Sequence, residues 1–259
     1  MTNLLEHLRT KGVRGYLRYK REKIQRDRAD RRHALEFYGQ FVGRGNLCFD
    51  VGAHKGGRTE WLLQLGARVI CVEPQPACAS ALRRRFRWKP VTVVEMAAGE
   101  AEGTATMMVS SVDVVSTLSQ DWIERATATG RFGTEQWEEK VQVPVTTLDK
   151  LIRQHGPPQF TKIDVEGYEL QALRGLTGQA GSLSFEFVGD NLERAQSCLN
   201  HLGTLGYRRF NYSAGESLSL AAPDWTDAEG LMKELGSRVD ALGWGDIYAL
   251  APEARRPLS

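Results

Sequence analysis

Short apolar runs alternate with longer amphipathic stretches along most of the chain after residue 45. Runs rich in β-branched and aromatic residues are typical of buried strands, and apolar positions three or four apart are typical of helices. The predicted strands are 47–49, 68–72, 91–94, 104–110, 141–146, 160–163, 183–187, 207–212 and 247–250. The helices predicted between them run through 61–65, 76–86, 148–154, 167–174 and 192–205. This alternation predicts one α/β domain with a doubly wound, mostly parallel sheet and helices on both faces.

A basic segment precedes this domain. Residues 1–42 lack proline and predict a helical N-terminal extension, with its second helix at about 16–41, so the domain is placed at 43–259. Residues 1–40 hold 11 Lys or Arg and five acidic residues, which gives them a charge of +6 within a total of +2. Such an arm fits a solvated helix, or contact with an acidic partner or a membrane surface. Nucleic-acid binding is disfavoured, because no recognition motif accompanies the charge.

Two insertions interrupt the predicted alternation, at about 111–140 and 213–246. They are predicted to be helical near 122–137 and 227–242, and we expect them to form the side of the domain that binds an acceptor molecule. Tryptophans in or beside these insertions are candidates for stacking on an acceptor, although helix packing is the more frequent use of this residue. They are Trp122, Trp137, Trp225 and Trp244.

Composition excludes several classes of protein. Hydrophobic residues make up 41% of the chain, which is enough for a core and argues against a disordered protein. The sequence has no apolar run of about 18 residues, as a membrane span requires, and no apolar signal segment at its start, so we expect a soluble cytoplasmic protein. The cysteines show no metal-ligand spacing and are expected to be reduced. They are Cys48, Cys71, Cys78 and Cys198.

Candidate chemistry is densest just after the first predicted strand, where residues 49–59 read FDVGAHKGGRT. Open α/β sheets bind ligands at the carboxyl ends of their strands, and a glycine turn before a helix brings free N–H groups close to an anion. Gly52 and Gly56 have the spacing G-x-x-x-G instead of the G-x-G-x-x-G of dinucleotide sites. This spacing favours a smaller anion, such as the carboxylate of a methionine group, over a pyrophosphate.

Glu73 strengthens this interpretation. It ends the second strand in Val72-Glu73-Pro74, and an acid at this place accepts hydrogen bonds from the hydroxyls of a ribose. The glycine turn and Glu73 together predict a nucleoside cofactor. The alternatives are a plain strand–helix turn and a solvated acid at a strand end.

Four sequence blocks resemble the FkbM-type S-adenosylmethionine-dependent methyltransferases. The blocks are Asp50-Val51-Gly52-Ala53-x-x-Gly56, Val72-Glu73-Pro74, Thr146-Thr147-Leu148-Asp149 and Lys162-Ile163-Asp164-Val165-Glu166-Gly167-Tyr168-Glu169. The last block is the most specific, and residues 244–248 are similar to the final strand of the family. The resemblance spans roughly 45–250. It implies a class I methyltransferase (Rossmann-like) fold, with a seven-stranded sheet whose last strand is antiparallel.

The resemblance also implies a cofactor, S-adenosylmethionine, and O-methylation of hydroxyls on sugars, glycans or secondary metabolites. It implies cofactor-binding roles for the turn residues Asp50, Gly52, Ala53, His54, Gly56 and Thr59, for Glu73 and Pro74 at the ribose, for Met96 and Ala97 at the adenine, and for Asp164 at the methyl donor. The sequence departs from the family at His54, where the family usually has Asn, so a side-chain contact from this position is in doubt.

An alcohol acceptor loses a proton during methylation, so a nearby carboxylate or imidazole would assist the reaction. The candidates for this catalytic role are Asp164, Glu166, Glu186 and His54. Each has a structural alternative: a helix cap for Asp164 or Glu166, an acid within a strand for Glu186, and a loop contact for His54.

Other functions are disfavoured by the same residues. Three carboxylates near one cleft would suit a divalent cation, but no regular ligand spacing supports a metal site and none is predicted. An NAD-dependent oxidoreductase is disfavoured by the glycine spacing and by the lack of a Tyr-x-x-x-Lys pair. A non-catalytic adaptor with a vestigial site is disfavoured by the intact Gly52 and Glu73.

Overall fold

A computed structural model describes residues 29–109, 117–119, 139–238 and 242–251. Most of the first predicted insertion, with its helix near 122–137, and residues 1–28 of the basic arm lie outside the described residues; of the helix predicted at about 16–41, the part at 29–38 is described and helical. None of the described helices is long and apolar enough to cross a membrane.

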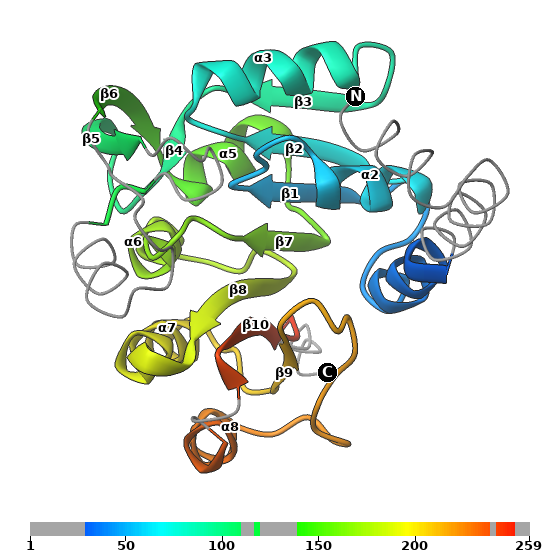
Figure 1. The fold of residues 1–259 in the computed structure, drawn as a ribbon, viewed down its shortest axis with the longest axis vertical. Coiled ribbons are helices and arrows are strands. Elements are labelled where there is room, and N and C mark those ends of the chain that lie inside the picture. Colours follow the sequence, from blue (N-terminus) through cyan, green and yellow to red (C-terminus); the bar gives the residue numbers. More distant parts are fainter. Residues whose placement is uncertain (1–28, 110–116, 120–138, 239–241, 252–259) are drawn as a thin grey trace, which may run out of the picture.

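A seven-stranded sheet forms the centre of the fold, in the order β3-β2-β1-β7-β8-β10-β9 (Figure 1). Its strands are β1 (Leu47–Val51), β2 (Arg68–Val72), β3 (Val91–Val94), β7 (Phe160–Ile163), β8 (Ser182–Val188), β9 (Phe210–Ala214) and β10 (Trp244–Ala249). β10 pairs antiparallel with both β8 and β9, whereas the pairs from β3 to β8 are parallel. The predicted mostly parallel, seven-stranded sheet is therefore confirmed.

Helices cover both faces of this sheet. They are a helix at 29–38, α2 (Gly57–Gln64), α3 (Pro76–Arg85), α5 (Leu148–His155), α6 (Glu169–Arg174), α7 (Leu192–Thr204) and α8 (Ala228–Ser237). Side chains alternate along β1, so that Phe49 and Val51 join the core beneath α5, α6, α7 and α8, while Cys48 joins the core beneath α2, α3 and the helix at 29–38. This alternation is what a sheet buried on both faces requires.

A second, three-stranded sheet lies beside the carboxyl end of β3, from which β4 continues (Figure 1). It consists of β4 (Ala97–Ala98), β5 (Gly103–Val109) and β6 (Glu139–Thr146) in the order β4-β6-β5. The sequence predicts β5 and β6 within a few residues, but it does not predict β4 or the separation into two sheets. A two-residue strand is too short to leave a periodic signal.

Two predicted boundaries near the C-terminus shift. The strand predicted from residue 207 begins at Phe210, because Tyr207 is buried and its hydroxyl donates a hydrogen bond to the carbonyl of Gly181 (2.7 Å). α8 ends at Ser237, and residues 239–241 of the helix predicted to 242 lie outside the described residues.

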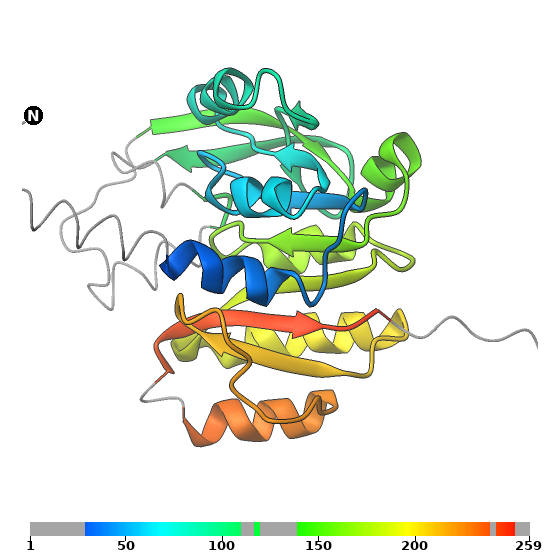
Figure 2. The ribbon, with the colours of Figure 1, turned by 90° about the vertical axis from the view of Figure 1, so that its right-hand side faces the viewer.

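The end of the predicted N-terminal extension contributes to the core of the domain. Ala34, Phe37, Tyr38, Phe41 and Val42 are all buried, and Figure 2 shows the helix at 29–38 lying over one face of the sheet. Apolar residues three and four apart place Ala34, Phe37 and Tyr38 on one face of this helix, and Phe41 and Val42 follow its end. Residues 34–42 thus belong to the packed fold, although the sequence places them before the domain.

Truncating Phe41 should destabilise the fold strongly, because its ring stacks on both Phe160 (centroids 5.3 Å apart) and Tyr248 (5.4 Å). We expect Phe41→Ala to lower the free energy of unfolding by about 3–5 kcal/mol, measured by urea denaturation. Arg32→Ala, at an exposed position on the same helix, serves as the matched control and should change it by less than about 0.5 kcal/mol. A Phe41→Ala protein as stable as the control would show that this packing contributes little.

Candidate functional site

A cavity of about 310 Å³ lies at the carboxyl ends of β1, β2 and β7. This is the size range of small-molecule sites. Most of the residues predicted for a cofactor line it: Asp50, Gly52, Ala53, His54, Glu73, Pro74, Met96, Ala97 and Asp164, together with Glu166 from the predicted catalytic set. The predicted residues that do not line it are Gly56, Thr59 and Glu186.

The two glycines of the turn are required by packing. Gly52 has φ +81°, and a Cβ atom there would lie 1.7 Å from the carbonyl oxygen of Asp164. Gly56 also has φ +81°, and its Cβ would lie 2.4 Å from the ring of Phe86 after α3. The G-x-x-x-G spacing therefore lets one turn pass between the end of β7 and α3, and Gly52 thereby brings Asp164 into the cavity wall.

Thr59 supports the turn from below. Its hydroxyl donates to Asp50 Oδ2 at 2.5 Å, and both residues are almost fully buried. Burial raises the pKa of Asp50, while this hydrogen bond and Lys162 act to lower it. Thr59 thus contributes to the site through Asp50, by joining the start of α2 to β1.

Glu73 is held by two backbone amides. Its Oε2 accepts from the N–H of His54 (2.8 Å) and its Oε1 from the N–H of Gln75 (2.9 Å), and the residue is 3% exposed. Burial raises the pKa of Glu73, and the two N–H bonds act in the opposite direction. The first bond requires His54 to adopt φ +48°, a left-handed conformation that Asn and His tolerate better than most residues. The bond to Glu73 comes from the backbone of residue 54, so it is compatible with either His or Asn at this position.

Three carboxylates gather at the cavity wall, and two of them, Asp164 and Glu166, line the cavity. Asp164, Glu166 and Glu186 each offer an oxygen within 4.8 Å of the others, so among the described residues they are a group that a metal ion would suit. Burial, followed by Asp164 and Glu166, raises the pKa of Glu186 well above its usual range. Burial also opposes ionisation of Asp164, but Lys162 outweighs it and lowers the pKa of that carboxyl. Asp164 is thus kept ionised, whereas Glu186 is protonated more readily than an ordinary glutamate.

Lys162 is the buried cation of this region and is 1% exposed. Its Nζ lies 2.8 Å from Asp164 Oδ2 and 3.6 Å from Asp246 Oδ1 on β10. Burial alone would lower the pKa of Lys162, but the two carboxylates raise it, so the side chain stays charged. The sequence alone predicts no role for Lys162 or Asp246; the available signal is a lysine within a short strand that is buried at every position.

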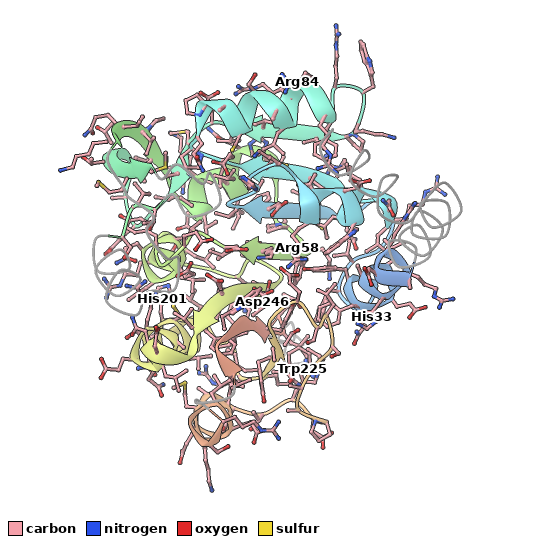
Figure 3. The ribbon with its side chains drawn as sticks, viewed as in Figure 1. His33, Arg58, Arg84, His201, Trp225 and Asp246 are labelled. Atoms are coloured by element: carbon pink, nitrogen blue, oxygen red, sulfur yellow. The ribbon has the colours of Figure 1, made fainter. Side chains whose placement is uncertain are left out.

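Arg58 on α2 is a second cation at the cavity. It lines the cavity beside Trp61, over whose ring it stacks, and its Nη2 lies 2.5 Å from Glu216 Oε2. Figure 3 shows Arg58 and Asp246 in the same central region of the molecule. Of the tryptophans that the structure describes, Trp61 lines the cavity, whereas the predicted candidates Trp225 and Trp244 do not. Trp225 packs edge-on against Phe41, and Trp122 and Trp137 lie outside the described residues.

The described part of the first insertion borders the cavity. Leu118 and Thr117 line it, and the hydroxyl of Thr117 donates to the carbonyl of Glu166 (2.5 Å). Arg194 on α7 bonds both Ser119 and the carbonyl of Gly167. These contacts attach the insertion to the 164–167 turn.

A comparison with family models decides the identity of the domain. The model of the methyltransferase FkbM domain matches residues 50–209. The chain belongs to this family. It is therefore a methyltransferase whose methyl donor is S-adenosylmethionine. Family membership also removes the case for an oxidoreductase.

Several solved structures are similar to this chain at low sequence identity. An rRNA methylase from Streptococcus thermophilus is 9% identical, with 85% of this chain and 94% of that chain covered and a TM-score of 0.43. A precorrin-6y C5,15-methyltransferase from Geobacter metallireducens is 13% identical, with 85% and 87% covered and a TM-score of 0.41. Cofactor-bound Rv0187 from MTB is 15% identical, with 88% and 81% covered and a TM-score of 0.42. No curated protein matches the chain.

The cavity residues of this FkbM-family methyltransferase fit S-adenosylmethionine. Glu73 presents a carboxylate to the cavity, as two ribose hydroxyls require, and Met96, Ala97 and Leu118 supply apolar contact surface for a base. The turn at Gly52 passes too close to the Asp164 backbone for any side chain, which keeps that part of the cavity open.

Replacing His54 tests whether its backbone or its side chain matters. His54→Asn should leave the affinity for S-adenosylmethionine within about two-fold, because Asn readily adopts positive φ. His54→Val should weaken it, since a β-branched residue is strained in this conformation by about 1–2 kcal/mol and the amide would leave Glu73. Calorimetric titration measures both; equal loss in the two variants would assign the contact to the imidazole.

Removing the charge of Lys162 should destabilise the protein. Lys162→Met leaves Asp246, which is 4% exposed, without its cation; breaking a buried pair in this way costs about 3–5 kcal/mol. The double variant Lys162→Met/Asp246→Asn should recover much of this loss, because it removes both charges. Chemical denaturation of the two variants makes the comparison, and a double variant less stable than the single one would contradict it.

Proposed function

We propose that this methyltransferase methylates a hydroxyl oxygen of a sugar, a glycan or a small secondary metabolite. The observation that carries the proposal is the carboxylate cluster in which Asp164 and Glu166 line the cavity and Glu186 lies directly behind them, within 4.8 Å. Methylation of a hydroxyl releases a proton, and a carboxylate cluster with a raised pKa is suited to take it up. An amine acceptor that is already deprotonated would have no such requirement.

We assign a different part of the cavity to each part of the cofactor. We assign Glu73 and Pro74 to the ribose, Met96 and Ala97 to the adenine, and the turn of Asp50, Gly52, Ala53 and His54 to the methionine group. Gly56 and Thr59 act indirectly, by packing against Phe86 and bonding Asp50. When bound, S-adenosylmethionine supplies an electrophilic methyl group on a sulfonium.

We assign uptake of the proton of the acceptor hydroxyl to the carboxylates of the chain. Asp164 lines the cavity and is kept ionised by Lys162, so its free oxygen is placed to accept a hydrogen bond from the hydroxyl. Interacting carboxylates titrate as a group, and within this one Glu186 has the raised pKa. We therefore assign hydroxyl orientation to Asp164 and proton storage to Glu186, with Glu166 as their neighbour. His54 lines the cavity and is the alternative proton acceptor.

Two further assignments belong to this proposal. Lys162 already supplies a positive charge 2.8 Å from Asp164, so no metal ion is assigned to the cluster. The two insertions form the acceptor side, in keeping with Thr117, Leu118 and Glu216 in the cavity wall. A chelator should accordingly leave methyl transfer unchanged.

The acceptor can be found directly. Purified protein with methyl-labelled S-adenosylmethionine is incubated with small-molecule and glycan extracts of the source organism, and labelled products are identified by mass spectrometry. We expect a product methylated on oxygen. Label found on RNA, protein or a nitrogen atom would overturn the acceptor class while leaving the methyltransferase assignment intact.

Glu186→Gln should lower turnover with that acceptor by about 100-fold or more, the usual contribution of a general base. Because the pKa of Glu186 is raised, its ionised fraction grows as pH rises above the ordinary range of glutamate, and turnover should climb with it. In the Glu186→Gln variant, turnover should no longer increase with pH over this range. Initial rates across pH measure the effect, and Glu193→Gln, an exposed position on α7, is the matched control. An unchanged increase with pH in Glu186→Gln would transfer the role to Asp164 or His54.

A further inference from the structure

A sharp turn carries an exposed tryptophan at one corner of the molecule. The turn joins the end of α3 to β3, the edge strand of the sheet (Figure 1). The N–H of Lys89 donates to the carbonyl of Phe86 (2.9 Å), which places Arg87 and Trp88 at the tip. Phe86 is buried against the core and anchors the turn. Trp88 is therefore presented on an ordered support and is 85% exposed.

The residues around this tryptophan are strongly basic. Residues 83–89 read RRRFRWK, with five cations in seven positions. Arg83 pairs with Glu95, and Arg85 bonds Glu60 and the carbonyl of Lys55, so these two cations have structural uses. Arg84, Arg87 and Lys89 are exposed and form no ion pair with the described residues. Figure 3 shows Arg84 on the outer side of α3.

Helix stability explains only part of this pattern. Cations in the last turn of α3 interact favourably with the helix dipole, which accounts for Arg83, Arg84 and Arg85. The helix dipole does not account for Lys89 or for the exposed indole of Trp88. Among the described residues, Trp88 is the one exposed large hydrophobic side chain. An exposed aromatic residue beside unpaired cations is the composition of a binding surface.

We propose that the turn of residues 84–89 is a docking surface for the anionic face of a lipid bilayer. Indole rings favour the boundary between headgroups and acyl chains, and cations beside them attract anionic headgroups. Arg87 stacks on the ring of Trp88, with its guanidinium 4.8 Å from the ring centroid, so the charge lies next to the apolar group that would enter the interface. The cavity lies at the carboxyl ends of the strands, whereas this turn precedes the start of β3, so docking leaves the cavity open.

The shape of the turn favours a bilayer over a nucleic acid. Proteins that bind single strands place several aromatic side chains along a groove, so that successive bases stack on them. Here a single indole stands at a convex tip and one of its faces is already covered by Arg87. A flat, fluid and anionic surface fits such a tip without a groove.

Vesicle co-sedimentation of the full chain tests the proposal. Binding to vesicles of phosphatidylcholine with phosphatidylglycerol should exceed binding to phosphatidylcholine alone and should fall with salt. Arg84→Gln, Arg87→Gln and Lys89→Gln should each weaken binding by about five-fold, and Trp88→Ala should weaken it by a similar factor. Lys233→Gln, an exposed cation on α8 at the opposite end of the sheet, should leave binding unchanged.

Thermal denaturation verifies that each variant is folded, which is expected because all four side chains are exposed. Emission of Trp88, obtained as the difference between the wild type and Trp88→Phe, should shift to the blue with anionic vesicles. Unchanged vesicle binding in a triple variant that combines Arg84→Gln, Arg87→Gln and Lys89→Gln would overturn the proposal and assign any binding to another basic surface. Binding of single-stranded polyuridine that depends on Trp88, without vesicle binding, would overturn it in favour of nucleic acid.

Discussion

The burial of one lysine among carboxylates is the constraint on which the site depends. Lys162 lies in register beside Asp50 on β1 and Ser184 on β8, on the face of the sheet beneath α2. Removing an ammonium from water is tolerated only when acidic groups replace the lost hydration. Asp164 and Asp246 do so from either side of β8, so one ion pair faces the cavity and the other joins β7 to the antiparallel strand β10. The charge state of Asp164 is thus linked to the packing of the last strand.

A second set of contacts fixes the backbone around the cavity. Gly52 passes over the carbonyl of Asp164, and the amide of His54 bonds Glu73, so three strand ends are connected through one turn. Because these contacts involve backbone atoms, the side chain at position 54 is free to differ from the Asn typical of the family. The positive φ at this position still restricts which residues are tolerated.

The strands and helices of the main sheet could be predicted because their apolar runs are short, bounded and regularly spaced. The position of Glu73 and of the glycine turn in the cavity wall could be predicted because it depends on local sequence at the strand ends. The burial of Phe41 could not, because its partners Phe160 and Tyr248 are far along the chain and the charge of residues 1–40 dominated the pattern. Lys162 was missed for the same reason: its counter-charge on β10 is distant in sequence, and a strand lysine by itself predicts exposure.

The geometry also separates two groups of residues that line the cavity. Glu73, His54 and Asp50 are fixed by contacts within the main sheet and its first turn, whereas each insertion reaches the cavity through its own contact. Thr117 bonds the carbonyl of Glu166, and Glu216 pairs with Arg58. Among the described residues, Glu73 is bonded by the backbone amides of His54 and Gln75, neither of which belongs to an insertion. Changes near Glu216 can therefore reshape the opening without breaking these bonds, whereas changes at Leu118 also alter the apolar part of the cavity wall.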